Sequence, residues 1–139
     1  SIEEAARTLV LQMLRDGIEA GPMLRLAGGD PTQVSARIVA QAAAEGDGLA
    51  SSILARAARG VGEALAQAVT LLAPRRIILG GGVSLIGEDG WFAPIRHYLD
   101  RLVFPPFRDT FDLVPAALGE EVVVHGALAL AREAAATPQ

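Results

Sequence analysis

One segment, residues 74–84, constrains the fold of this chain more than any other stretch. A proline ends a long apolar pattern, a short β-branched run follows, and Gly80, Gly81 and Gly82 interrupt it. A strand that ends in glycines lets a ligand approach the main chain without meeting a Cβ atom. In open α/β sheets, ligands bind at the carboxyl ends of the strands, which is where this bend falls. The segment therefore predicts an α/β fold with a ligand site at the bend formed by residues 80–84, called here the glycine bend.

The spacing of apolar residues predicts the other elements. Helices are expected over residues 2–18, 36–45, 49–73, 91–103 and 120–135, and strands over residues 76–79 and 110–114. Ser35 is the expected N-cap of the second helix and Gly46 its left-handed stop. In the longest helix, Gly60 and Gly62 predict close packing against another helix or a sheet. The stripe expected to face inward there comprises Ile53, Ala57, Val61, Leu65, Ala68, Val69 and Leu72.

Two strands bridged by a helix predict a short βαβ unit in a helix-rich chain. The first strand, which is mostly apolar, is expected to be covered on both faces. Two strands alone make a poor sheet, and the chain starts at Ser1 without a methionine. We therefore expect residues 1–139 to be a single partial domain of a longer protein, with residues 136–139 as a frayed tail.

Composition excludes several classes of function. The formal charge is −4 and the isoelectric point about 5.1, which argues against a nucleic-acid-binding surface. The Arg75–Arg76 pair is expected to be solvated. The sequence has no cysteine, hence no disulfide and no thiolate metal site. It has no apolar run long enough to span a membrane and no start resembling a signal peptide. A cytoplasmic location is the expectation.

Residues 71–84, LLAPRRIILGGGVS, resemble the C-terminal half of the ROK family, which groups glucokinase-like bacterial sugar kinases with sugar-responsive repressors. Further stretches agree in order and spacing: residues 43–47 (AAEGD), 94–96 (PIR), 104–106 (FPP), 114–119 (VPAALG) and 126–129 (GALA). The resemblance implies the C-terminal part of an actin-like, ribonuclease H-like ATPase domain. It also implies that Gly80, Gly81, Gly82, Val83 and Ser84 line a nucleotide pocket for ATP, with magnesium in the intact protein.

The resemblance also suggests a role for the first residues. A zinc motif of the family ends in a glycine-cysteine-apolar-glutamate run, and Ser1-Ile2-Glu3 could overlay its last three positions. Glu3 would then contact the hydroxyl groups of a hexose. By its position alone, Glu3 is a first-turn acid of a helix. Ser1 would stand where a zinc-binding cysteine is usual, which puts a structural zinc in doubt, and no metal ligand is assigned.

The family's phosphate-binding and catalytic aspartates have no counterpart here, so no catalytic residue is assigned and the chain alone is expected to be inactive. Three readings of the intact protein remain open. One is an ATP-dependent hexose kinase, and the second is the effector domain of a repressor that binds nucleic acid through an upstream helix-turn-helix. The third is a non-catalytic oligomerisation module. The resemblance implies a homodimer, and the lack of a long apolar run leads us to expect no membrane partner.

Overall fold

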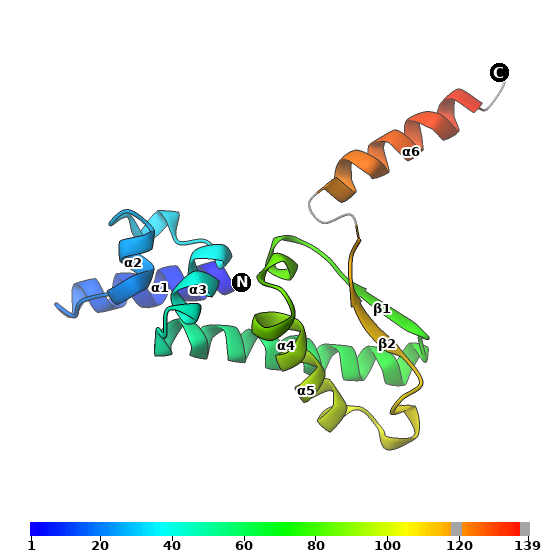
Figure 1. Cartoon of the computed structure of the whole chain (residues 1–139), viewed down its shortest axis with the longest axis horizontal. Coiled ribbons are helices and arrows are strands. Elements are labelled where there is room, and N and C mark those ends of the chain that lie inside the picture. Colours follow the sequence, from blue (N-terminus) through cyan, green and yellow to red (C-terminus); the bar gives the residue numbers. More distant parts are fainter. Residues whose placement is uncertain (118–120, 137–139) are drawn as a thin grey trace.

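The computed structural model describes residues 1–117 and 121–136. A cluster of short helices lies at one end of a long helix, and the strands lie towards its other end (Figure 1). The elements are α1 (Ile2–Arg15), α2 (Gly21–Leu26), α3 (Ala36–Ala44), α4 (Gly48–Leu72), β1 (Arg76–Leu79), α5 (Ala93–Leu102), β2 (Asp112–Pro115) and α6 (Val122–Ala136). The predicted elements are confirmed with small shifts of their ends, and α2 is added. The tail predicted for residues 136–139 lies outside the described residues, apart from Ala136.

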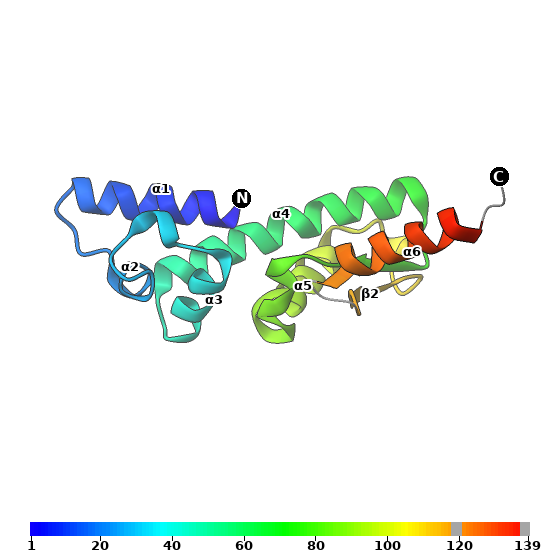
Figure 2. The same ribbon diagram turned by 90° about the horizontal axis from the view of Figure 1, so that it is seen from above.

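Local capping chemistry sets the helix ends near the glycine bend. The Ser35 hydroxyl accepts a hydrogen bond from the Ile38 amide (3.3 Å) and caps α3 as predicted. Gly46 follows that helix with φ of 92°, a conformation that favours glycine. The Asp47 carboxylate then accepts from the Leu49 amide (2.9 Å) and begins α4. These caps set the turn between α3 and the start of α4, and the two helices contact each other there (Figure 2).

The two strands form a parallel pair. Arg76 lies opposite Asp112 and Leu79 opposite Pro115, and α5 lies between the strands in the chain, so the βαβ unit is confirmed. Ile77 and Leu79 pack against the core, whereas Ile78 is 63% exposed. The expectation that both faces of β1 are covered is therefore wrong for this chain. Only one face of the strand meets the core that the helices build.

The buried face of α4 differs from the predicted stripe. Its buried residues are Ala50, Leu54, Ala58, Gly62, Ala66 and Val69. Most of the predicted residues flank this line and are half-buried, and Leu72 is exposed. Small side chains face the neighbouring helices because close helix packing leaves no room for large ones. Gly62 shows this directly, since a Cβ atom there would lie 2.8 Å from Tyr98 Cβ on α5; at Gly60 it would meet nothing.

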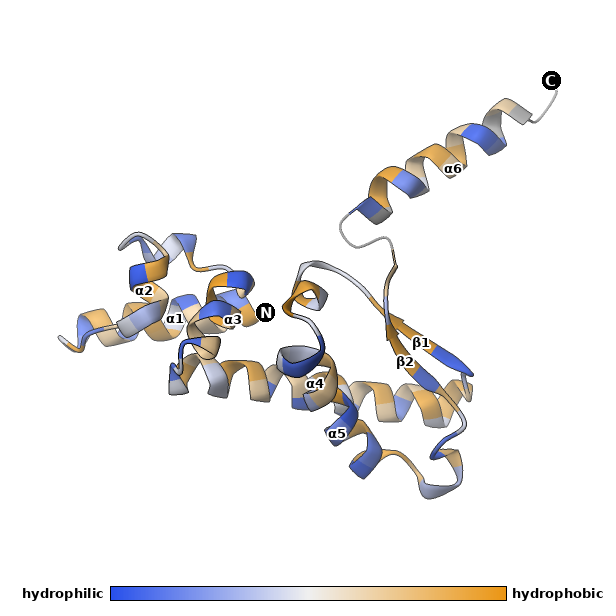
Figure 3. Cartoon of the chain, viewed as in Figure 1, coloured by the Kyte–Doolittle hydropathy of each residue, from blue (hydrophilic) through white to orange (hydrophobic). Residues whose placement is uncertain are grey.

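Most of the large apolar side chains between α1 and α5 belong to one core, in which Met23, Phe92, Ile95 and Leu99 are almost fully buried. By contrast, α6 extends away from the other elements (Figure 1) and carries exposed apolar residues (Figure 3): Val123, Val124, Leu128 and Leu130. Among the described residues, no helix combines the length and apolar character needed to cross a membrane.

Arg76 is paired rather than merely solvated. Its Nε donates to Asp112 Oδ1 (2.9 Å) and its Nη2 to Asp112 Oδ2 (2.6 Å), across the first register position of the sheet. These hydrogen bonds from Arg76 lower the pKa of Asp112, and its positive charge acts in the same direction. The pair therefore links the two strands where β1 begins.

We expect this pair to make stability depend on pH in the acid range. A carboxylate whose pKa is lower in the folded than in the unfolded state stabilises the fold above the unfolded pKa of about 3.9, and this contribution is lost as pH falls through the folded pKa. The pair is exposed, so the effect is small. The melting temperature of Asp112→Asn should fall less steeply than that of the parent chain below about pH 4. Asp100→Asn, on the exposed side of α5, is the control, and equal slopes for all three proteins would contradict the assignment.

Candidate functional site

The glycine bend is open on one side. Gly81 has φ of 92° and ψ of 169°, and Gly87 has φ of 91° and ψ of −170°, a region that is essentially restricted to glycine. Between them residues 82–86 form a short 3-10 turn. A Cβ atom at Gly81 would meet nothing within 4 Å, whereas one at Gly80 would lie 3.1 Å from the Cβ atom of Ala116, the residue that follows β2. The backbone at Gly81 is thus accessible from outside.

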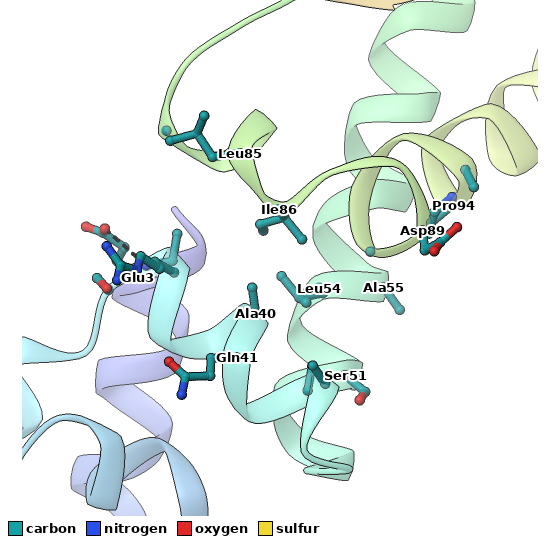
Figure 4. Close-up of a pocket in the computed structure, with 18 of the residues that line it drawn as sticks. Glu3, Ala40, Gln41, Ser51, Leu54, Ala55, Leu85, Ile86, Asp89 and Pro94 are labelled. Atoms are coloured by element: carbon teal, nitrogen blue, oxygen red, sulfur yellow. Dashed lines mark hydrogen bonds between the residues drawn. The ribbon is translucent and has the colours of Figure 1, made fainter. Parts of the chain in front are cut away.

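A cleft of about 1340 Å³ lies beside this bend. It is larger than the roughly 300–1,000 Å³ typical of small-molecule pockets. The start of α1, the helix α3, the first turns of α4, the 82–86 turn and the first turns of α5 surround it (Figure 4). The residues that line it are Glu3, Ser35, Ala36, Arg37, Ala40, Gln41, Ala43, Ala44, Ser51, Leu54, Ala55, Gly82, Leu85, Ile86, Asp89, Gly90, Ala93, Pro94, His97 and Tyr98.

The middle of the cleft is apolar. Ala40 of α3, Leu54 of α4 and Ile86 of the 82–86 turn point toward a common space (Figure 4). We call these three residues the apolar slot. Leu85, which is 62% exposed, lies beside it on the same turn. A slot of this kind can take a flat apolar or aromatic group, with polar residues around it to set orientation.

Glu3 lies at one end of the cleft (Figure 4). Its Oε1 accepts a hydrogen bond from the Ala36 amide (3.2 Å), which belongs to the first turn of α3, and its Oε2 lies 3.7 Å from Arg7 Nη2. The helix dipole of α3 favours a carboxylate in this place. The side chain remains 44% exposed, so its oxygens can still accept hydrogen bonds from a ligand.

The structure brings two of the predicted site residues together. Gly82 and Glu3 line the same cleft, although they are far apart in the sequence. Gly80, Gly81, Val83 and Ser84 are not among the lining residues, and their contact with a nucleotide stays a prediction. The Ser84 hydroxyl is buried and has no hydrogen-bond partner in the described part of the chain. Most buried hydroxyl groups in proteins do have one.

The apolar slot was not predicted from the sequence. Ala40 and Leu54 are ordinary helix residues there, and no local pattern marks them as ligand-facing. His97 also lines the cleft and is exposed.

The residues that the structure describes do not fit a structural zinc. The chain has no cysteine, and the Ser1 hydroxyl accepts a hydrogen bond from the Glu4 amide (3.2 Å) as the N-cap of α1. Within residues 1–117 and 121–136, no three histidine or acidic side chains are grouped as a metal ion would require.

Comparison with known proteins identifies the family. The ROK family model matches residues 14–134. A glucokinase of Thermotoga maritima is 30% identical over 132 residues, which is 93% of this chain and 41% of that protein. A glucokinase of Streptomyces coelicolor is 35% identical over 112 residues, 80% of this chain and 35% of that protein.

A solved structure agrees with the fold. The ROK family glucokinase from Streptomyces griseus, in complex with glucose and AMPPNP, superposes with a TM-score of 0.77 at 29% identity, over 95% of this chain and 41% of that one. The chain thus spans between about a third and two fifths of the length of these relatives. The predicted fold, an α/β arrangement from the C-terminal part of an actin-like ATPase, is confirmed, and the chain belongs to the ROK family.

Proposed function

We propose that this chain is the adenosine-binding C-terminal part of an ATP-dependent hexose kinase of the glucokinase type. The observation that carries the proposal is the cleft itself, which is lined by the apolar slot, by Gly82 of the glycine bend and by Glu3. The solved relative from Streptomyces griseus holds glucose and AMPPNP together, which supports a site for both a nucleotide and a sugar.

The chemistry of each part fits this role. The slot offers apolar contact to both faces of a purine, and Gly82 allows the backbone to come close to the nucleoside. Glu3 would accept hydrogen bonds from sugar hydroxyls. Phosphoryl transfer also needs a base and neutralisation of phosphate charge, with magnesium accompanying ATP. No residue of this chain is assigned to those tasks. We therefore expect the chain alone to bind the nucleoside but not to catalyse phosphoryl transfer.

The effector domain of a repressor would need no purine slot. A repressor would therefore bind a hexose in the intact protein without binding adenosine. The proposal also includes the homodimer that the family resemblance implies, which sedimentation velocity of the intact protein checks, and the cytoplasmic location that composition led us to expect.

Nuclear magnetic resonance titration with adenosine tests the proposal, since it detects weak binding and needs no turnover. We expect shifts of the amides of Ala40, Leu54, Gly82 and Ile86. Ala40→Glu places a charge in the slot and should weaken adenosine binding at least about tenfold, because a carboxylate resists desolvation. Substitution at Gly81 is less informative, because its φ of 92° strains any other residue whether or not a ligand is present.

Ala64→Glu, on the exposed surface of α4, is the matched control and should leave adenosine affinity unchanged. If adenosine shifts none of the slot amides, or if the two glutamate variants lose the same affinity, the nucleotide assignment is wrong.

A further inference from the structure

We propose that Arg96 is a positioning residue that holds the Ile86 wall of the apolar slot without touching the ligand. This inference rests on the proposed function. It arises because Arg96 lies outside the cleft lining, yet it joins three elements behind one wall of the cleft.

The first contacts fix Arg96 itself. It is carried by α5, and its Nη2 donates to the main-chain oxygen of Leu113 in β2 (2.9 Å). Its guanidinium carbon lies 5.8 Å from the centre of the Phe92 ring, which is almost fully buried. An arginine with a planar fork can make both kinds of contact at once. The side chain is therefore tied to β2 and to the core.

The second contact reaches the wall. Arg96 Nη1 pairs with the Glu88 carboxylate, at the start of the turn that leads into α5. Residues 88–92 of this turn are wound as a π-helix, in which the Phe92 amide donates to the Gly87 oxygen (3.4 Å) and the Ala93 amide to the Glu88 oxygen. Single π-turns are rare and often occur at functional sites. The Arg96–Glu88 pair closes this turn against α5.

Ile86, the wall of the slot, packs against the turn of residues 88–92. A Cβ atom at Gly90 would lie only 2.7 Å from Ile86 Cγ2, so Ile86 is seated directly on the Gly90 backbone. The Cγ2 methyl belongs to a β-branched side chain, which cannot easily rotate away. A displacement of residues 88–92 therefore also moves Ile86, which forms one side of the apolar slot.

The test compares two variants whose changes in charge are opposite. Arg96→Gln removes a positive charge and Glu88→Gln removes a negative one, yet each variant should break the Arg96–Glu88 ion pair and loosen the turn of residues 88–92. We expect each variant to weaken the binding of adenosine and the binding of ATP to the same extent, by about twofold to fivefold. Both should also speed hydrogen exchange at the amides of Trp91, Phe92 and Ala93, without speeding it in the middle of α4.

The pair Arg59–Glu63 supplies matched controls. It is also an arginine–glutamate pair (2.8 Å), but both residues belong to α4 and neither lines the cleft. Arg59→Gln and Glu63→Gln repeat the two changes in charge and should alter neither affinity nor exchange at residues 91–93. Glu88→Gln retains the Arg96 bond to Leu113, so it is a milder variant if Arg96→Gln folds poorly.

The outcomes separate this inference from the proposed function. If Arg96→Gln weakens ATP but not adenosine, and Glu88→Gln weakens neither, Arg96 contacts phosphate and the positioning role is wrong. Unchanged exchange at residues 91–93 in both variants also overturns it. If the parent chain binds neither ligand, the proposed function fails, and faster exchange in both variants would still show that Arg96 holds the wall.

Discussion

Replacement of Phe92 by alanine is expected to destabilise the chain by about 3–5 kcal/mol, the usual cost of removing a buried phenylalanine ring. Phe92 is only 2% exposed and is among the largest fully buried side chains of the core. It ends the π-turn and supports the Arg96 guanidinium, so its loss leaves a cavity at the junction of α4, α5 and the wall of the cleft. Urea denaturation followed by circular dichroism measures the loss.

A conservative variant and a control make the result specific. Phe92→Leu retains part of the volume and should cost distinctly less. Phe104→Ala removes the same ring from a position that is 57% exposed and should change stability by no more than about 0.5 kcal/mol. Similar losses for Phe92→Ala and Phe104→Ala would mean that the ring of Phe92 is not part of the core.

The second large effect is expected at Gly62. A Cβ atom there would lie 2.8 Å from Tyr98 Cβ and 3.2 Å from the Leu99 amide nitrogen, so a side chain at this position would push α5 away from α4. Alanine raises helix propensity by about 1 kcal/mol over glycine, but the overpacking should exceed this gain. We expect a net loss of about 1–2 kcal/mol for Gly62→Ala and about 3 kcal/mol for Gly62→Val.

Gly60 is the matched control, two residues earlier in the same helix. A Cβ atom there would meet nothing within 4 Å. Gly60→Ala should therefore stabilise the chain by up to about 1 kcal/mol, because only the helix propensity changes. Thermal melts of the two alanine variants should move in opposite directions. Shifts of the same sign would contradict the close approach of α4 and α5.

The Gly62 prediction concerns the contact between α4 and α5, and Phe92 lies in the turn that leads into α5; both regions also position the cleft. The first turns of α4 contribute Leu54 to the slot, and α5 carries Arg96 behind the opposite wall. Variants that separate these helices without unfolding the chain, such as Gly62→Ala, are therefore expected to lower adenosine affinity as well as stability.

Much of the fold could be read from local sequence signals. Ser35 and Gly46 delimit α3, Pro74 follows the long helix, and the glycines after Leu79 end β1. Each of these signals acts through the backbone of its own neighbours: a capping hydroxyl, a missing amide donor or a missing Cβ atom. The glycine bend could be recognised as a candidate site for the same reason, and the order of the motifs indicated the family.

Only the tertiary structure decided which faces are buried and what the cleft contains. The inward face of α4 carries small residues because the approach of α5 excludes larger ones at Gly62, and apolar periodicity cannot detect that distance. The slot joins Ala40, Leu54 and Ile86, which come from three separate elements. None of these three side chains is of a type that indicates a ligand site in a sequence. Glu3 reaches the Ala36 amide across 33 residues. Such contacts join residues that are far apart in the sequence, so they depend on how the helices pack. Local propensity acts only over a few neighbouring residues and cannot predict them.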